Sequence, residues 1–150
     1  MKNLFFTLAF LFSIFYANSQ WSYENVDNGF DDSYRIAYTT SNNGAFLKLE
    51  NVDGDVIFYI QGKYYCDDFP LVDLVFVVNG VNVKYSIEGM KSDDGKVIFF
   101  VADLINSEML TSFQKCTVLK VRVNESYCSS ETYSFNMSKS TSALNYIQYK

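Results

Sequence analysis

Apolar and polar side chains alternate along most of the chain, which is the pattern of β-strands that bury one face. Tyr34, Ile36 and Tyr38 alternate with small or polar residues, and Leu47 and Leu49 do so further along. This two-residue period and the abundance of Tyr, Phe and Val favour strands. The expected strands cover residues 21–26, 34–40, 45–50, 56–65, 71–78, 81–88, 96–101, 117–123 and 131–137.

Short polar segments separate these strands and predict turns. Asn79-Gly80 is the favoured pair for a two-residue type I′ hairpin, because both positions need a positive φ. Residues 56–65 carry apolar side chains on both faces, which indicates a central strand. About nine strands, with turn signals about every 8 to 12 residues, are typical of an antiparallel sandwich or barrel.

The period of the pattern changes after residue 101. Ala102, Ile105, Met109 and Phe113 are spaced like one face of a helix, and Asp103 is a candidate N-cap. A second short helix could form near the C-terminus, through Ala143, Leu144 and Ile147. The predicted fold class is therefore all-β: an antiparallel β-sandwich, Greek-key or barrel-like, with one short peripheral helix and room for a short C-terminal helix.

The N-terminal segment has the features of a secretory signal peptide. Lys2 precedes an apolar run from Leu4 to Ala17, and small residues follow up to Ser19. The run is 14 residues long, and a membrane-spanning helix needs about 20. We therefore expect a signal peptide over residues 1–19 and a single β-sandwich domain over residues 20–150. The mature protein would be secreted or periplasmic and would not span the membrane.

Composition and charge exclude several classes of function. The chain has 12 Lys and Arg against 17 Asp and Glu, a net charge of −5, and no basic cluster. Nucleic acid is therefore not an expected partner, since phosphate binding needs concentrated basic residues. The chain has no histidine, which excludes Ser-His-Asp and Cys-His nucleophile systems and His-ligated zinc sites. No P-loop, GxGxxG or GxSxG motif is present, so no cofactor is expected.

The segment "GKYYCDDFP" at residues 62–70 concentrates chemically distinctive side chains. Asp67 and Asp68 could supply half of a carboxylate site together with Asp31 and Asp32, as in glycan hydrolases. Adjacent residues on an extended chain point in opposite directions, so one pair cannot provide both the acid and the base on one face. A solvated loop is the favoured interpretation, and no catalytic residue is assigned.

Three acidic segments, at residues 27–32, 51–55 and 92–95, could in principle bind calcium. Each lacks the regular series of oxygen ligands and the closing Glu of a calcium loop. They are interpreted as turns, and no metal site is predicted.

Three cysteines in an exported chain allow one disulfide and one free thiol. If residues 117–123 and 131–137 form a hairpin, Cys128 lies in its loop and Cys116 lies at the far end, about 23 Å away. A disulfide needs Cα atoms within about 7 Å. The pair Cys116–Cys128 is therefore disfavoured. Cys66 lies just past an expected strand, where chain ends and loops meet, so the predicted pair is Cys66–Cys128, with Cys116 as a buried free thiol. An intermolecular disulfide through Cys116 is the alternative.

Aromatic side chains offer a candidate binding surface. Tyr59 and Tyr65 share one strand face, and Trp21 or Tyr23 could join them. Exposed aromatic residues on a sheet stack on sugar rings or anchor protein partners. The competing interpretation places the same residues in the core.

The order of features over residues 45–147 resembles the small periplasmic proteins grouped as invasion-associated locus B-like. The resemblance is carried by Cys66, Cys128, the "VLKVRV" strand at residues 118–123 and the "STSAL" tail at residues 140–144. The second cysteine pair of that family is absent here. The resemblance implies an exported β-sandwich without known catalytic residues, and it supplies no mechanism.

Three classes of function follow from these observations. The leading one is an exported, monomeric, non-catalytic protein that binds a protein or glycan ligand. A small carboxylate-dependent glycan hydrolase is the first alternative, and a structural subunit that assembles through strand edges is the second. A binder should expose a contiguous apolar or aromatic patch, whereas a hydrolase should hold two carboxyl groups about 5–10 Å apart.

Overall fold

The computed structural model describes residues 21–27, 33–52, 55–100 and 107–148. The predicted signal peptide, the acidic segment around Asp31 and the N-cap candidate Asp103 lie outside these residues. The described strands are β1 (Ser22–Asp27), β2 (Ser33–Thr40), β3 (Phe46–Val52), β4 (Asp55–Gln61), β5 (Leu71–Val78), β6 (Val81–Lys91), β7 (Val97–Phe100), β8 (Val118–Asn124) and β9 (Glu131–Asn136). The described helices are α2 (Ser107–Lys115) and α3 (Ser140–Gln148).

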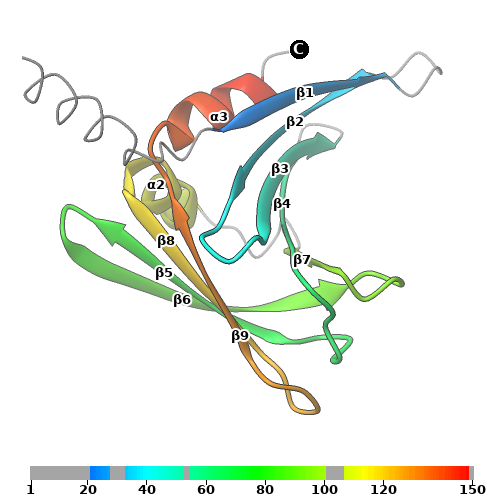
Figure 1. The fold of residues 1–150 in the computed structure, drawn as a ribbon. Helices are drawn as coiled ribbons and strands as arrows, with labels where there is room; N and C mark the ends of the chain where they lie inside the picture. The colour runs from blue at the N-terminus through cyan, green and yellow to red at the C-terminus, as the bar shows by residue number, and fades with distance from the viewer. Residues whose placement is uncertain (1–20, 28–32, 53–54, 101–106, 149–150) are drawn as a thin grey trace, which may run out of the picture.

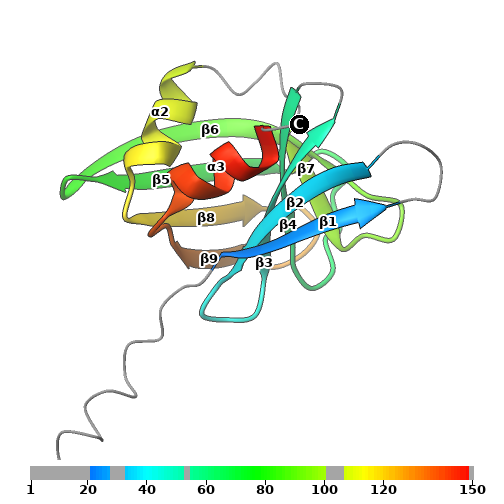
Figure 2. The same ribbon diagram turned by 90° about the horizontal axis from the view of Figure 1, so that it is seen from above.

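The nine strands form one hydrogen-bonded sheet in the order β1-β2-β3-β4-β7-β6-β5-β8-β9, with every neighbouring pair antiparallel. Strand β6 joins the two halves of the sheet, since Val81 to Glu88 pair with β5 and Gly89 to Lys91 pair with β7. The two halves incline toward each other, and both helices lie on the side where the sheet is open (Figures 1 and 2). The predicted all-β antiparallel fold is confirmed.

The Asn79-Gly80 hairpin forms as predicted. Asn79 has a φ of 51° and Gly80 has a φ of 79°, as a type I′ turn requires. Val78 and Val81 face each other on either side of the turn, and the β5–β6 pairing continues from there to Leu71 and Glu88. This local signal therefore fixes the register of the longest hairpin in the sheet.

The core lies between the two halves of the sheet and beneath α2. The inward positions expected in β3, β8 and β9, among them Leu47, Leu49, Val121 and Phe135, are buried. The alternation is wrong for β2, where Ala37 and Thr39 are buried and Ile36 and Tyr38 line the outer face, because the aromatic residues of this strand lie on the side that the core does not cover. A small cavity of about 20 Å³ remains where the halves meet. Its apolar lining comes from Leu47, Phe58, Ile60, Leu74, Phe76, Ile87, Phe100, Met109, Phe113 and Leu119. A space of this size holds at most about one water, and its lining offers that water no hydrogen-bond partner.

Strands β4 and β6 differ from their predicted limits, and β6 continues to Lys91, past its expected end at residue 88. The strand expected over residues 56–65 ends at Gln61. A side chain at Gly62 would overlap the hydroxyl groups of Tyr65 and Tyr133, so the chain leaves the sheet where glycine makes room for them. Both expected helices are present, and α3 buries the three apolar residues that predicted it, Ala143, Leu144 and Ile147. No helix among the described residues is long and apolar enough to cross a bilayer.

The two edges of the sheet differ in how they are covered. The turn between β2 and β3 lies against β9, where the Asn42 N–H donates to the Ser134 carbonyl (3.4 Å) and the Asn43 side-chain amide donates to the Thr132 carbonyl (3.0 Å). Strand β1 pairs with β2 on one side and with no other described strand.

Candidate functional site

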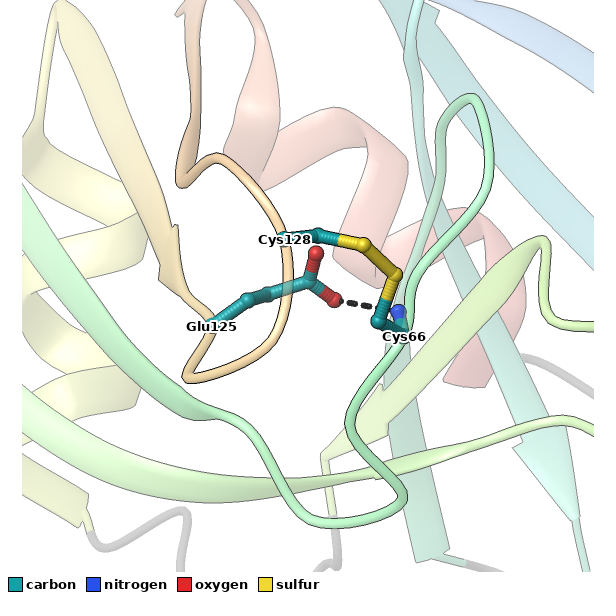
Figure 3. Close-up of side chains that lie close together, drawn as sticks. All are labelled: Cys66, Glu125 and Cys128. Atoms are coloured by element: carbon teal, nitrogen blue, oxygen red, sulfur yellow. Dashed lines mark hydrogen bonds between the residues drawn. A yellow bond between two sulfur atoms is a disulfide. The ribbon is translucent and has the colours of Figure 1, made fainter.

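Cys66 and Cys128 form a disulfide, in agreement with the prediction from strand lengths. Their Cα atoms lie 6.0 Å apart although the residues are separated by 62 positions in the sequence. The bond joins the loop after β4 to the loop between β8 and β9 (Figure 3). Cys116 is a buried free thiol, and burial raises the pKa of the Cys116 thiol to about 12.

Two carboxylates connect the same loops by reciprocal hydrogen bonds. The Cys66 N–H donates to Glu125 Oε1 (2.8 Å), as Figure 3 shows. The Ser126 N–H donates to Asp67 Oδ2 (2.6 Å). Each loop therefore supplies one acceptor for the backbone of the other, in addition to the disulfide between them. Hydrogen bonds to ionised acceptors are among the stronger ones in proteins.

Lys91, the last residue of β6, holds the loop after β4 against the sheet. Its ammonium group donates to the Cys66 carbonyl (2.9 Å) and pairs with Asp68 Oδ1 (3.0 Å). The hydrogen bond that Lys91 donates to Asp68 raises the pKa of Lys91. The two neighbouring aspartates of "YYCDDFP" therefore have separate structural partners, Ser126 for Asp67 and Lys91 for Asp68.

The turn between β6 and β7 is the third segment at this end of the molecule. The Tyr65 N–H donates to the Gly95 carbonyl (2.7 Å), and the Gly62 N–H donates to the Lys96 carbonyl (3.0 Å). Asp94 accepts hydrogen bonds from Ser92 and Lys96, and the Ser92 contact contributes most to lowering the pKa of Asp94. Residues 62–71, 88–96 and 124–131 are called the disulfide end below.

The four aromatic residues proposed as a binding surface do not lie together. Trp21 and Tyr65 are 4% and 0% exposed and belong to the core. Tyr23 faces α3, where its ring packs edge-on against Tyr146 at 4.8 Å. Tyr59 lies on the opposite, outer face of the sheet and is 9% exposed. The interpretation as core residues is therefore correct for Trp21 and Tyr65.

Tyr65 has a buried partner that the sequence pattern did not indicate. Its hydroxyl donates to the hydroxyl of Tyr133 at 3.1 Å, although the two residues are 68 positions apart. Burial, followed by this hydrogen bond, raises the pKa of Tyr65 well above its usual value. Burial also raises the pKa of Tyr133. The pair closes the core directly beneath the disulfide end.

Tyr59 lies beside a shallow groove on the outer face of β1 to β4. The groove has a volume of about 250 Å³ and is lined by Glu24, Ile36, Tyr38, Phe46, Lys48 and Gln61. Several polar groups in and beside this groove already bind one another. The Tyr38 hydroxyl donates to Glu24 (3.0 Å), and the Tyr59 hydroxyl donates to Glu50 (2.9 Å). Burial, together with the bond to Glu50, raises the pKa of Tyr59.

Large exposed apolar side chains are concentrated at the disulfide end. Among the described residues, seven large hydrophobic side chains are exposed, and five of them belong to this end. The five are Tyr64 (63%), Phe69 (62%), Leu71 (51%), Met90 (45%) and Tyr127 (88%). The other two, Tyr23 and Val81, belong to β1 and to the β5–β6 hairpin. The sequence indicated none of these five as a binding residue.

Cys66, Cys128 and Glu125 form the one group among the described residues whose composition could suit a metal ion. Their ligand atoms lie within 4.8 Å of one another (Figure 3). Cysteine binds metals as a thiolate, and the bond between the two sulfur atoms leaves neither of them as a thiolate. The group therefore functions as a covalent connection between two loops in the form that the structure shows.

No protein-family model, curated protein or solved structure matches this chain. The resemblance to invasion-associated locus B-like proteins thus stays a prediction, and the function must be inferred from the geometry.

Proposed function

We propose that this protein is an exported, non-catalytic binding protein whose contact surface is the disulfide end. The observation that carries the proposal is the concentration of five of the seven large exposed apolar residues at this end. Scattered apolar residues are normal on protein surfaces, but clustered ones mark interaction sites. Large aromatic side chains such as Tyr127 and Phe69 are also typical anchors of binding interfaces.

The rigidity of the disulfide end supports this proposal. The disulfide, the two carboxylate contacts and the Lys91 contacts hold the loops in one arrangement before any partner binds. A surface that is ordered in advance loses less conformational entropy on binding. The disulfide also suits a secreted or periplasmic location, because such bonds persist in oxidising compartments.

The carboxylates at this end favour binding over hydrolysis. Asp67 and Glu125 each accept a hydrogen bond from a backbone N–H, and Asp68 forms an ion pair with a lysine. Each of these contacts holds a loop in place. A glycan hydrolase needs one carboxyl group to donate a proton and a second to attack or to activate water. Carboxylates already committed to backbone N–H groups and to a lysine are poorly placed for either task.

Site-specific photo-crosslinking tests the proposal. A photoreactive benzoylphenylalanine would replace Phe69 or Tyr127 in the protein produced by its native cells. The matched control would replace Val81, which is also an exposed apolar residue (64%) but lies on the β5–β6 hairpin. We expect crosslinked products from positions 69 and 127 and none from position 81.

Two other results would contradict the proposal. Equal crosslinking from all three positions would mean that the disulfide end is not a distinct surface, and no crosslinking at positions 69 and 127 would mean that it has no partner. A product consisting of two copies of the chain would support the structural-subunit alternative instead.

A further inference from the structure

We infer that the partner of the disulfide end is a cationic polypeptide segment that carries apolar side chains. This inference rests on the proposed function and adds the chemical class of the partner. The disulfide end contains seven acidic and three basic residues, so its net charge is −4. The net charge of the whole chain is −5. The surface that holds five of the seven large exposed apolar side chains is therefore also acidic.

The backbone pairing places the central apolar residues on one face. Gly89 donates to the Pro70 carbonyl and Lys91 donates to the Asp68 carbonyl, which extends the β5–β6 pairing past Leu71 and Glu88. In this antiparallel register Phe69 lies opposite Met90. The residue pairs on either side of them are hydrogen-bonded, so Phe69 and Met90 form a non-hydrogen-bonded pair, in which opposite side chains approach most closely. Side chains two residues apart share a face of the strand, so Leu71 lies on the same side as Phe69.

The patch continues onto the next strand. Met90 lies opposite Phe99 of β7, and Phe99 packs against Tyr59 with 5.7 Å between ring centroids. The side chains of Phe69, Leu71 and Phe99 offer no hydrogen-bonding groups, and the Met90 thioether is only a weak acceptor. Such a surface suits the apolar side chains of a polypeptide better than the hydroxyl groups of a glycan.

Acidic side chains accompany this patch. Glu88 lies directly opposite Leu71 and is exposed. Asp94, on the turn between β6 and β7 at the same end, accepts hydrogen bonds that lower the pKa of its carboxyl. Of the three basic residues, Lys91 is 15% exposed and is engaged by Asp68. The remaining negative charge attracts cations and raises their association rate.

The same charge disfavours two other occupants. A second copy of the chain would bring two ends of charge −4 together, and like charges across an interface oppose binding. An anionic membrane surface would be repelled in the same way. A polypeptide that combines Lys or Arg with apolar residues satisfies both properties of the surface.

Three labelled synthetic peptides of equal length test the inference with the purified, oxidised protein. The first alternates lysine and tryptophan, the second replaces each lysine with glutamate, and the third replaces each tryptophan with serine. Fluorescence anisotropy would measure binding at low and at high salt. We expect the lysine–tryptophan peptide to bind at least about tenfold more tightly than either control, since both charge and apolar contact contribute. Added salt should weaken its binding several-fold.

Matched variants locate the binding surface. Phe69→Ser combined with Met90→Ser should weaken binding of the lysine–tryptophan peptide about tenfold or more, whereas Val81→Ser should leave it unchanged. Glu88→Gln should weaken binding, whereas Glu108→Gln, which removes an exposed charge on α2, should not. Unchanged thermal unfolding would show that each variant is folded.

Three results would overturn the inference: equal binding of the lysine and glutamate peptides, equal effects of the Phe69/Met90 and Val81 variants, or no peptide binding. Crosslinking from positions 69 and 127 distinguishes the two proposals. If the crosslinks form but the cationic peptide does not bind, the class of partner is wrong and the binding function stands. If the crosslinks are also absent, both proposals fail.

Discussion

Removal of the Cys66–Cys128 disulfide should strongly destabilise the protein. The bond joins residues separated by 62 positions, and closing a loop of that length lowers the conformational entropy of the unfolded chain by the equivalent of about 4 kcal/mol. We expect the variant Cys66→Ala/Cys128→Ala to lose about 3–4 kcal/mol of unfolding free energy. Cys66 is only half-buried and Cys128 is exposed, so truncating the two side chains adds little to this loss.

Urea denaturation of the wild-type protein and the double variant would measure the effect. Because the bond restricts the unfolded chain, its removal should also raise the dependence of unfolding free energy on urea concentration. Wild-type protein treated with a reducing agent should behave like the variant. A loss below about 0.5 kcal/mol, or three free thiols in the untreated wild-type protein, would refute the reasoning.

Three further predictions concern buried groups. Tyr133→Phe should lower the unfolding free energy by about 2 kcal/mol, because the buried Tyr65 hydroxyl loses its acceptor. Tyr65→Phe should lower it by only about 1 kcal/mol. Urea denaturation measures both values, and equal losses would contradict the assignment of Tyr65 as the donor. The raised pKa values of Tyr59, Tyr65 and Tyr133 contribute stability below pH about 10 that is lost at higher pH, since the unfolded tyrosines ionise first. The melting temperature should therefore fall as pH rises above about 10, and a constant value would contradict this. Cys116, with its thiol pKa raised to about 12, should react with a thiol reagent only after unfolding; rapid labelling of the folded protein would show that it is accessible.

The sequence predicts those parts of the fold that depend on neighbouring residues. Alternation identifies the inward positions of β3 and β8, because adjacent side chains on a strand point to opposite faces. Asn79-Gly80 identifies its hairpin through the positive φ that both positions need. The disulfide could also be predicted, because the length of a strand disfavoured the pair Cys116–Cys128 and Cys66 was expected just past a strand, where loops meet.

The candidate site depends on contacts that no local pattern contains. Glu125 and Cys66 are 59 positions apart, and Lys91 lies 25 positions from Cys66. Alternation also does not show which face of a strand another element covers. Tyr65 lies past the end of β4 and is buried only because the chain turns at Gly62 and meets Tyr133.

The acidity and the apolar character of the disulfide end are best understood together. An apolar cluster as exposed as Phe69, Leu71 and Met90 promotes contact with any other apolar surface, including a second copy of the chain. The net charge of −4 at the same place opposes that self-contact and leaves attraction to cationic partners intact. In the proposed complex, charge would provide selectivity and the apolar side chains would provide most of the affinity. The covalent and ionic links between the loops keep both properties on one surface before a partner arrives, which lowers the entropy lost on binding.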